Sequence, residues 1–241
     1  MENLPESLQR KLASDFDQVA HRYDTLQRFN PGYSGDLLRS AQRLQAPARG
    51  RILDVCCGTG LSTEALRETY PNADITALDI SSGMLTTAQR KPRLRNVRFI
   101  VGDAMDLEKS GALGPFDAIL MAYGIRNVPD SDLCLQRLHA QLAPGGRIAF
   151  HEYSVAGSLW SRAVWNTVAS AIIVPLGAAL TGSPTLFRYL RRSVNDFDSI
   201  PAFEARLRRA AFERIVTLRM PGWRNGIVHT VMAEKASLAA S

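Results

Sequence analysis

The sequence has little cysteine, and it has no internal repeat, low-complexity run or polar linker. Its 241 residues include three cysteines, and Cys56 and Cys57 are adjacent, which suits neither a disulfide framework nor a zinc-ligand spacing. We therefore expect reduced thiols and no bound metal. Residues 1–7 are acidic and carry no apolar stretch, so we predict no secretory signal and a cytoplasmic location. The length and the absence of linkers predict one domain over residues 1–241.

Basic runs interleaved with aromatic residues are also absent, so we predict no nucleic-acid partner. The net charge of +6 lies mostly in residues 188–241, which hold ten Lys or Arg against five Asp or Glu. Such a basic section suits an anionic membrane surface or an acidic substrate. We therefore expect peripheral contact with the inner face of the membrane. The sequence leaves a homodimer open.

Hydrophobic periodicity predicts an alternation of strands and helices after an amino-terminal helical cap at 1–46, which is broken near 30–32. Strands are expected near 51–55, 75–79, 97–101, 116–121 and 147–153, with helices near 61–70, 82–90 and 131–142. This alternation is typical of a parallel α/β sheet with helices on both faces. A helix at 202–211 precedes strands at 215–220 and 227–233, and the short turn between them makes these strands antiparallel.

A glycine turn follows the first strand directly. The stretch reads Asp54-Val55-Cys56-Cys57-Gly58-Thr59-Gly60, and a helix opens immediately after it. Glycines let the backbone approach a ligand closely, and the start of the helix offers unpaired N–H groups. This pattern predicts a nucleotide-sized ligand at the carboxyl ends of the strands.

An acidic residue lies at the end of each of three successive predicted strands, and these acids narrow the choice of ligand. Asp54 precedes the turn, where a carboxylate repels pyrophosphate and suits an ammonium group. Asp79 ends the second strand and can bind a ribose diol. Asp103 ends the third strand and can accept a hydrogen bond from the amino group of adenine, while Ile80 and Met84 can sandwich the ring.

The turn resembles the acid-x-G-x-G-x-G motif of class I S-adenosylmethionine-dependent methyltransferases, with Cys56 where the first glycine usually lies. The resemblance implies a Rossmann-like sheet, mostly parallel with an antiparallel carboxyl-terminal strand, and S-adenosylmethionine as cofactor. The cofactor residues that it implies are Tyr23, Asp54, Cys56, Gly58, Gly60, Asp79, Ile80, Met84, Asp103, Ala104 and Ala122.

A narrower resemblance rests on Tyr23-Asp24, on Tyr-Gly-Ile-Arg-Asn-Val at 123–128 and on Arg-Tyr-Leu-x-x-Ser-Val at 188–194. These segments look like the ubiquinone/menaquinone biosynthesis C-methyltransferase family. The likeness implies C-methylation of a lipophilic, prenylated quinol or phenol. One departure is His-Glu-Tyr-Ser at 151–154, where the family more often has Leu-Glu-Phe-Ser. An O- or N-methyltransferase of a hydrophobic secondary metabolite and a non-catalytic, cofactor-binding accessory protein are the alternatives.

Four residues are expected to act on the acceptor. Arg126 can hold a phenolate or a bridging water, and Asn127 can fix the orientation of the ring. His151, at the end of the fifth strand, is expected to take a proton. Tyr123, like Tyr23, is expected to close over the cofactor or the substrate. For each residue a purely structural role is the alternative.

Residues 163–187 contain no charged side chain and are long enough to span a bilayer. They lie between segments predicted to belong to one sheet, which argues against a span. We expect a helical lid at 155–195 over a hydrophobic substrate, interrupted at Asn166, Pro175, Gly177 and 182–184. A pair of core-packing helices is the alternative.

Overall fold

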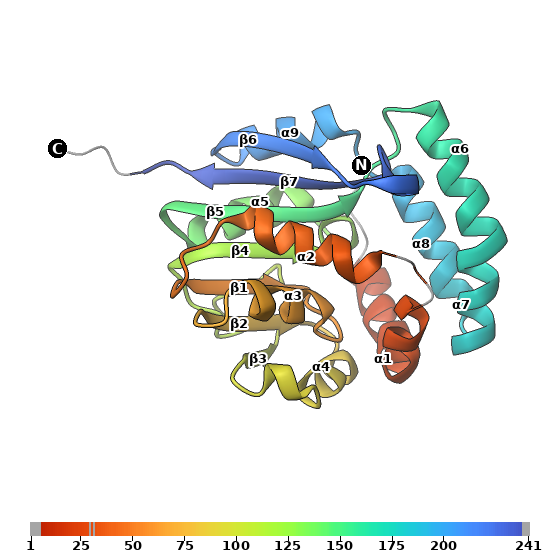
Figure 1. Cartoon of the computed structure of the whole chain (residues 1–241), viewed down its shortest axis with the longest axis horizontal. Helices are drawn as coiled ribbons and strands as arrows, with labels where there is room; N and C mark the ends of the chain where they lie inside the picture. The colour runs from red at the N-terminus through yellow and green to blue at the C-terminus, as the bar shows by residue number, and fades with distance from the viewer. Residues whose placement is uncertain (1–5, 29, 31, 238–241) are drawn as a thin grey trace.

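Seven strands form one twisted sheet in the computed structural model of the chain, which describes residues 6–28, 30 and 32–237 (Figure 1). The strands are β1 Arg51–Val55, β2 Asp74–Asp79, β3 Arg98–Val101, β4 Phe116–Ala122, β5 Leu142–Tyr153, β6 Phe212–Arg219 and β7 Val228–Lys235. Their order is β3-β2-β1-β4-β5-β7-β6, and β7 runs antiparallel to β5 and β6. The predicted mostly parallel sheet with an antiparallel carboxyl-terminal strand is confirmed.

Helices cover both faces of this sheet. They are α2 Tyr33–Leu44, α3 Leu61–Thr69, α4 Ser82–Gln89, α5 Ser131–Gln141 and α9 Ile200–Arg209, with short turns η1 Pro92–Leu94, η2 Ile125–Asn127 and η4 Gly222–Arg224. One apolar core joins α5 and α9 to the sheet, and a second joins α2 and α3 to it. The buried strands β1 and β4 lie between these two cores, because their side chains are apolar on both faces.

Two expected strand starts and one helix placement were wrong. The sixth strand begins at Phe212 and not near 215, because it pairs with β7 from Phe212 onward across a bulge at 213–216. The fifth strand begins at Leu142 and not near 147, because Leu142 pairs with Phe116 before a bulge that takes up the glycine pair at 145–146. Helix α2 was expected in the cap, but it packs along the sheet. Its stripe of Leu37, Ala41 and Leu44 is buried there, and Tyr33 and Leu37, in its first two turns, also reach the ligand side.

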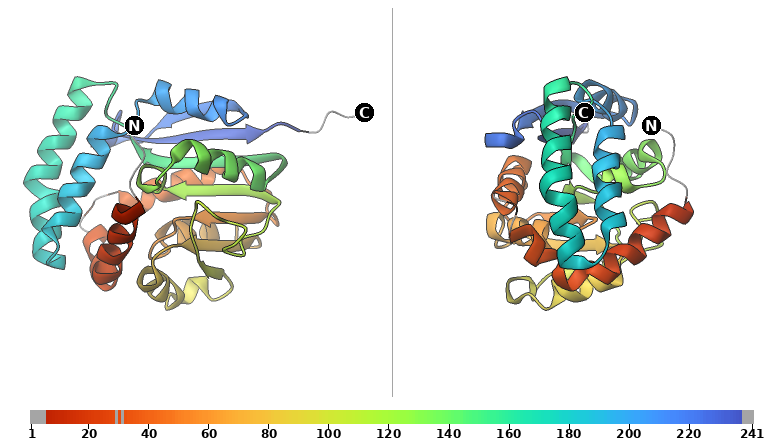
Figure 2. Two further views of the ribbon diagram at one scale, coloured as in Figure 1. Left: turned by 180° about the vertical axis from the view of Figure 1, so that it is seen from behind. Right: turned by 90° about the vertical axis from the view of Figure 1, so that its right-hand side faces the viewer.

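Helix α1, Glu6–Arg28, and a helical hairpin gather at one end of the sheet (Figure 2). The hairpin begins with α6 Leu159–Val168, continues through the π-turn η3 Ala169–Ile173 into α7 Val174–Thr181, and returns as α8 Pro184–Asp196. The expected break at Pro175 does not occur, because the π-turn before it accommodates a residue without an N–H group. The helix instead ends at Gly182, in the left-handed conformation.

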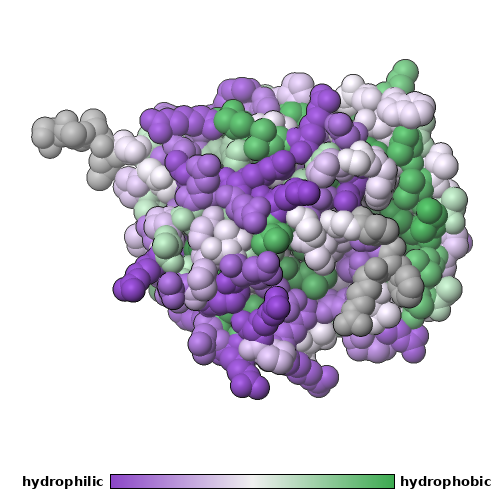
Figure 3. Space-filling model, in the orientation of Figure 1, coloured by the Kyte–Doolittle hydropathy of each residue, from purple (hydrophilic) through white to green (hydrophobic). Residues whose placement is uncertain are grey.

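The segment Leu159–Thr181 is long and apolar enough to cross a membrane by length and composition. Only 17% of its most apolar window is buried, so most of it faces outward. Figure 3 shows the resulting band of hydrophobic side chains along the edge formed by α6 and α7. The inner face of the same hairpin packs against α1, which ties it to the rest of the domain.

Candidate active site

The two glycines of the turn have different environments. Gly58 and Gly60 both adopt left-handed backbone angles, with φ of 54° and 81°. A Cβ atom on Gly58 would meet nothing within 4 Å, and Gly58 lines a cavity. A Cβ atom on Gly60 would lie 2.8 Å from Leu94 and 3.0 Å from Ala88. Gly58 therefore leaves room for a ligand, whereas Gly60 allows close packing; the expected ligand contact of Gly60 is not among the cavity's lining.

Cys56 takes the first glycine position of the motif with φ of 59°, a left-handed angle that is uncommon for a residue with a side chain. Burial raises the pKa of its thiol well above the ordinary value, as it does for Cys57. The thiol is therefore protonated and acts as a small side chain in the wall of the cavity.

Asp54 lies behind the turn, fully buried, and does not line the cavity. The hydroxyls of Ser62 and Thr63 donate to its Oδ2 at 2.8 and 2.6 Å, and Oδ1 has no partner within the described part of the chain. Burial raises the pKa of Asp54 to about 7. The sequence suggested a direct contact of Asp54 with a ligand ammonium; of this pair, Ser62, which donates to Asp54, lines the cavity and Asp54 does not.

Asp79 ends β2 at the cavity wall, as predicted. Its Oδ2 accepts a hydrogen bond from the Gly58 N–H at 2.7 Å and its Oδ1 accepts one from the Ser81 N–H at 2.9 Å. Burial raises the pKa of Asp79, and these two hydrogen bonds oppose the rise. The carboxylate thus fixes the glycine turn and the start of α4 while its edge remains at the cavity.

The remaining predicted cofactor residues lie around the same space, which we call the nucleoside cavity. Asp103 accepts a hydrogen bond from the Met105 N–H at 2.8 Å, which orients its carboxylate at the end of β3. The lining includes Tyr23, Cys56, Gly58, Asp79, Ile80, Met84, Asp103, Ala104 and Ala122. The cavity therefore combines two carboxylates with apolar walls, which suits a nucleoside ring and its sugar.

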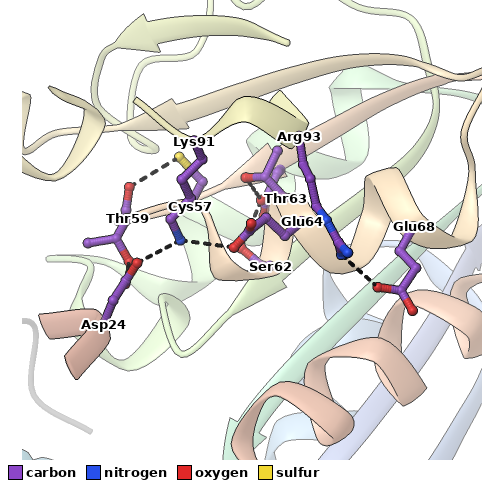
Figure 4. A network of polar contacts seen from close by, with 11 residues as sticks. Asp24, Cys57, Thr59, Ser62, Thr63, Glu64, Glu68, Lys91 and Arg93 are labelled. Carbon is purple, nitrogen blue, oxygen red and sulfur yellow. Dashed lines mark hydrogen bonds and ion pairs between the residues drawn. The ribbon is translucent and has the colours of Figure 1, made fainter. Parts of the chain in front are cut away.

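A network of ion pairs and a hydrogen bond, which the sequence did not predict, joins α1 to the glycine turn. Asp24 accepts a hydrogen bond from the Thr59 hydroxyl and pairs with Lys91 at 2.7 Å. Lys91 also pairs with Glu64 at 3.0 Å, so that its amino group bridges two acids (Figure 4). The sequence drew attention to the Tyr23-Asp24 pair, but it could not predict the partners of Asp24, because Thr59 and Lys91 are distant from it in sequence.

A second cavity of about 460 Å³ lies between the sheet end, α1 and the helical hairpin. We call it the aromatic chamber, because five of the six tyrosines of the chain line it, namely Tyr23, Tyr33, Tyr123, Tyr153 and Tyr189. Apolar side chains of η3, α7 and α8 form its other wall. Phe16, Tyr23, Tyr33, Tyr123 and Asn127 line both cavities. The chamber and the nucleoside cavity therefore meet at these five residues.

Arg126 brings a buried positive charge to the chamber. It pairs with Glu152 at 3.4 Å, and it donates to the carbonyl oxygen of Tyr123 at 3.2 Å. Its Nε has no partner among the described residues. Asn127 donates to the same carbonyl at 3.0 Å and accepts from the Tyr189 hydroxyl at 3.0 Å. Arg126 and Asn127 are thus both fixed at the chamber wall, Arg126 by Glu152 and Asn127 by Tyr189, and both donate to the Tyr123 carbonyl.

His151 is completely buried and lines neither cavity. Its Nε2 lies 2.8 Å from the Tyr123 hydroxyl, and its Nδ1 lies 2.8 Å from the Ser40 hydroxyl. Burial lowers the pKa of His151 to about 3, so the imidazole is neutral. The expectation that His151 takes a proton from the acceptor does not match this position, because Tyr123 stands between them.

Residues 6–235 match the model of the ubiE/COQ5 methyltransferase family. The chain belongs to this family. It is 33% identical to the demethylmenaquinone methyltransferase of Thermus thermophilus, with 82% of this chain and 90% of that protein covered. It is also 33% identical to the ubiquinone/menaquinone biosynthesis C-methyltransferase UbiE of Bradyrhizobium diazoefficiens, with 88% of each covered. The predicted family and methyltransferase activity are confirmed.

Solved structures agree on the fold. An S-adenosylmethionine-dependent methyltransferase from Thermotoga maritima has a TM-score of 0.66 at 18% identity, with 93% of this chain and 99% of that chain covered. The plantazolicin methyltransferase BpumL, solved with S-adenosylhomocysteine, has a TM-score of 0.63 at 13% identity, with 96% and 98% covered. S-adenosylmethionine is the methyl donor of the methyltransferase studied here. The nucleoside of S-adenosylmethionine suits the cavity beside Gly58, which also has the Asp79 carboxylate and the apolar side chains of Ile80 and Met84 in its wall.

Asp79→Asn tests the nucleoside cavity. Replacing a charged hydrogen-bond acceptor by an amide should remove about 1.5–3 kcal/mol, which is roughly ten- to a hundredfold in cofactor affinity by calorimetric titration. Asp74→Asn, at the exposed opposite end of the same strand, is the matched control and should leave the affinity unchanged. Equal affinity of the folded Asp79→Asn variant and the wild type would reject the assignment.

Gly58→Ala and Gly60→Ala should separate the two glycines. Both variants strain a left-handed backbone, by about 1–2 kcal/mol. Only Gly60→Ala also collides with Leu94 and Ala88, so it should lose a further ~1–3 kcal/mol of unfolding free energy in urea titrations. Gly58→Ala should instead weaken cofactor binding at least tenfold. A larger stability loss in Gly58→Ala than in Gly60→Ala would contradict this division.

Proposed function

We propose that this methyltransferase methylates a ring carbon of a reduced, prenylated quinone bound in the aromatic chamber. The observation that carries the proposal is the junction of the two cavities, where Tyr123 and Asn127 line both and Arg126 stands at the chamber side. The chamber is largely apolar, and its volume of about 460 Å³ suits a ring with the start of an isoprenoid tail. The names of the Thermus and Bradyrhizobium relatives support the same acceptor class.

S-adenosylmethionine, when bound, supplies an electrophilic methyl group on a sulfonium. The chain's own residues then have three tasks, which are to hold the acceptor ring in line, to exclude water and to make the ring electron-rich. Helices α1, α7 and α8 line the chamber and limit the access of water to it. Arg126 stabilises the negative charge of a phenolate oxygen, which raises electron density at the neighbouring ring carbon. Asn127 fixes the ring's orientation.

The lining of the chamber favours carbon over oxygen as the methylated atom. Either product releases one proton, which is the hydroxyl proton in O-methylation and, net, the ring-carbon proton in C-methylation. The described lining residues of the chamber include no Asp, Glu or His, so in either case the proton leaves to solvent. The positive charge of Arg126 holds the phenolate oxygen and lowers the nucleophilicity of that oxygen relative to the neighbouring ring carbon. The methyl group is therefore directed to carbon.

We also propose that the hairpin rests on the inner face of an anionic membrane, from which the acceptor enters. Leu159 and Trp160 are 86% and 78% exposed at the start of α6, and Ile172 is 53% exposed while it also lines the chamber. Exposed arginines flank this apolar face, at positions 162, 188, 191 and 192. An apolar edge with arginines beside it suits anionic lipid.

Arg126→Gln tests the acceptor site. It should lower single-turnover methylation of a reduced short-chain prenylated quinone at least tenfold, because the lost interaction is with a developing phenolate. Cofactor affinity should stay within about threefold. Burial already raises the pKa of Glu152, so the unpaired acid can take up a proton and the fold should survive.

Arg126→Lys should rescue only part of the rate, since lysine keeps the charge but lacks the planar fork. Full activity in folded Arg126→Gln would remove Arg126 from the mechanism. A product methylated on oxygen would favour the O-methyltransferase alternative.

The membrane proposal predicts binding to vesicles that contain anionic lipid, weakening as salt is raised. Combining Leu159→Ser with Trp160→Ser should reduce this binding tenfold or more in sedimentation assays, because two large side chains no longer enter the lipid. Leu113→Ser, which changes a leucine that is 58% exposed and remote from both cavities, is the control. Retention in membranes after alkaline washing would indicate an integral span instead.

A further inference from the structure

Two side chains in the lining of the aromatic chamber are exposed to solvent, and they mark where the chamber opens. Ile172, in the π-turn η3, is 53% exposed, and Trp223, in the turn η4 between β6 and β7, is 38% exposed. Every other described residue of the lining is buried or half-buried. A cavity meets the outside where its lining is accessible, so Ile172 and Trp223 lie at the mouth of the chamber.

One face of α6 connects the two sides of this mouth. A Cβ atom on Gly226, shortly after η4, would lie 3.1 Å from the hydroxyl oxygen of Ser161 in the first turn of α6. Val168, about two helical turns further along and therefore on the same face, lines the chamber. Figure 1 accordingly shows the turn between β6 and β7 beside α6. The mouth is therefore bounded by α6 and η3 on one side and by η4 on the other.

A buried ion pair fixes the position of η4. Arg224 lies 2.7 Å from Asp36 in the first turn of α2, and both side chains are buried. The guanidinium also lies over the ring of Trp223, with its Cζ 5.5 Å from the ring centroid. It passes so close to Gly32 that a Cβ atom would not fit there. Burial of two charges costs desolvation free energy, which their attraction offsets in part. What the pair supplies is position, because it joins η4 to α2 and holds Trp223 at the mouth.

The size and chemistry of the mouth indicate what passes through it. A chamber of about 460 Å³ suits a ring with the start of an isoprenoid tail, so a longer tail has to continue outside. Ile172 and Trp223 are both large and apolar. The first turn of α6, beside η4, carries the exposed Leu159 and Trp160. An isoprenoid chain that leaves here covers apolar surface on its way to the lipid, which is favourable.

We propose that the tail of the acceptor leaves the chamber between Ile172 and Trp223, and that contact with Trp223 favours acceptors with a tail over the bare ring. Trp223 is then a specificity-determining residue, and Arg224 is a positioning residue that acts through it. This inference rests on the proposed function, since it specifies how the same chamber treats the part of the acceptor that does not react. The reacting ring stays at the junction of the two cavities, beside Asn127.

Kinetics with two probes test the contact with the tail. The probes are 1,4-dihydroxynaphthalene and its farnesylated form, kept reduced and assayed in solution without vesicles, so that membrane contact does not contribute. The variants are Trp223→Ala and Trp223→Phe. Leu218→Ala is the matched control, because Leu218 is also 38% exposed and lies on β6 ahead of η4, but lines neither cavity.

Trp223→Ala should lower kcat/KM for the farnesylated probe about tenfold and leave that for the bare ring within about twofold, because the lost contact is with the tail. Trp223→Phe keeps an apolar wall and should stay within about threefold of the wild type for both probes. Leu218→Ala should change neither value. Equal losses for both probes in Trp223→Ala, or no loss for either, would overturn the inference. Failure of every enzyme form to methylate either probe would instead reject the proposed function.

The positioning role of Arg224 has its own test. Arg224→Met removes the ion pair and should lower the preference for the farnesylated probe over the bare ring, whereas Arg224→Lys keeps the charge and should restore part of it. Burial already raises the pKa of Asp36, so the acid left by Arg224→Met can take up a proton. Adding Trp223→Ala to Arg224→Met should reduce the preference no further than Trp223→Ala alone. A loss in Arg224→Met that is equal for both probes would show a purely structural role.

Fluorine-19 spectra of protein labelled with 5-fluorotryptophan give a readout that does not depend on turnover. The chain has three tryptophans, at 160, 165 and 223, and each signal is assigned by replacement with phenylalanine. Farnesol, a tail without the ring, should shift the Trp223 signal saturably, and Ile172→Ala should weaken this effect. A farnesol shift confined to Trp160, which lies outside the chamber lining, would refute the tail path, whatever the acceptor proves to be.

Discussion

The close approach of the ends of β1 and β4 is the constraint on which both cavities depend. A Cβ atom on Gly124 would lie 2.8 Å from the Cβ of Cys56, so the two loops touch only because position 124 has no side chain. Cys56 and Tyr123 both adopt left-handed angles at this contact, with φ of 59° and 58°. These strained angles turn Tyr123 into the boundary between nucleoside cavity and chamber. The separation of the two cavities is thereby set by backbone rather than by flexible side chains.

The charges on the two sides of this boundary are opposite. Acids gather at the nucleoside cavity, and Arg126 stands at the chamber. The buried Asp54 has its pKa raised to about 7 from an ordinary value near 4. The folded state therefore holds this proton more tightly than the unfolded chain, and the stability from this group falls as pH rises through that interval. A cation in the neighbouring cavity offsets that cost, whereas a phenolate there would increase it.

Strands and strand-end acids were predictable because they depend on local patterns. Apolar runs identify β1 and β4, and the chain direction of a parallel sheet brings Asp79 and Asp103 to one edge. The roles of Gly60 and His151 were not predictable. Whether a glycine faces a ligand or Leu94, and whether an imidazole faces a chamber or Ser40, depends on neighbours distant in sequence. The same holds for Asp24, whose partner Lys91 lies in the turn between α4 and η1.

The segment Leu159–Thr181 shows why composition alone cannot decide between a lid and a membrane span. Its length and hydropathy satisfy both. The strands on either side of it decide the matter, because β5 precedes the hairpin, β7 follows it, and the two pair along their lengths in one sheet. A single membrane span would place β5 and β7 on opposite sides of the membrane, where they could not pair. The segment could enter a membrane only if the chain returned to the side from which it came. The inner face of the hairpin contacts α1 and lines the chamber, while its outer face stays apolar. The hairpin therefore lines the chamber with one face and presents an apolar surface to the outside with the other.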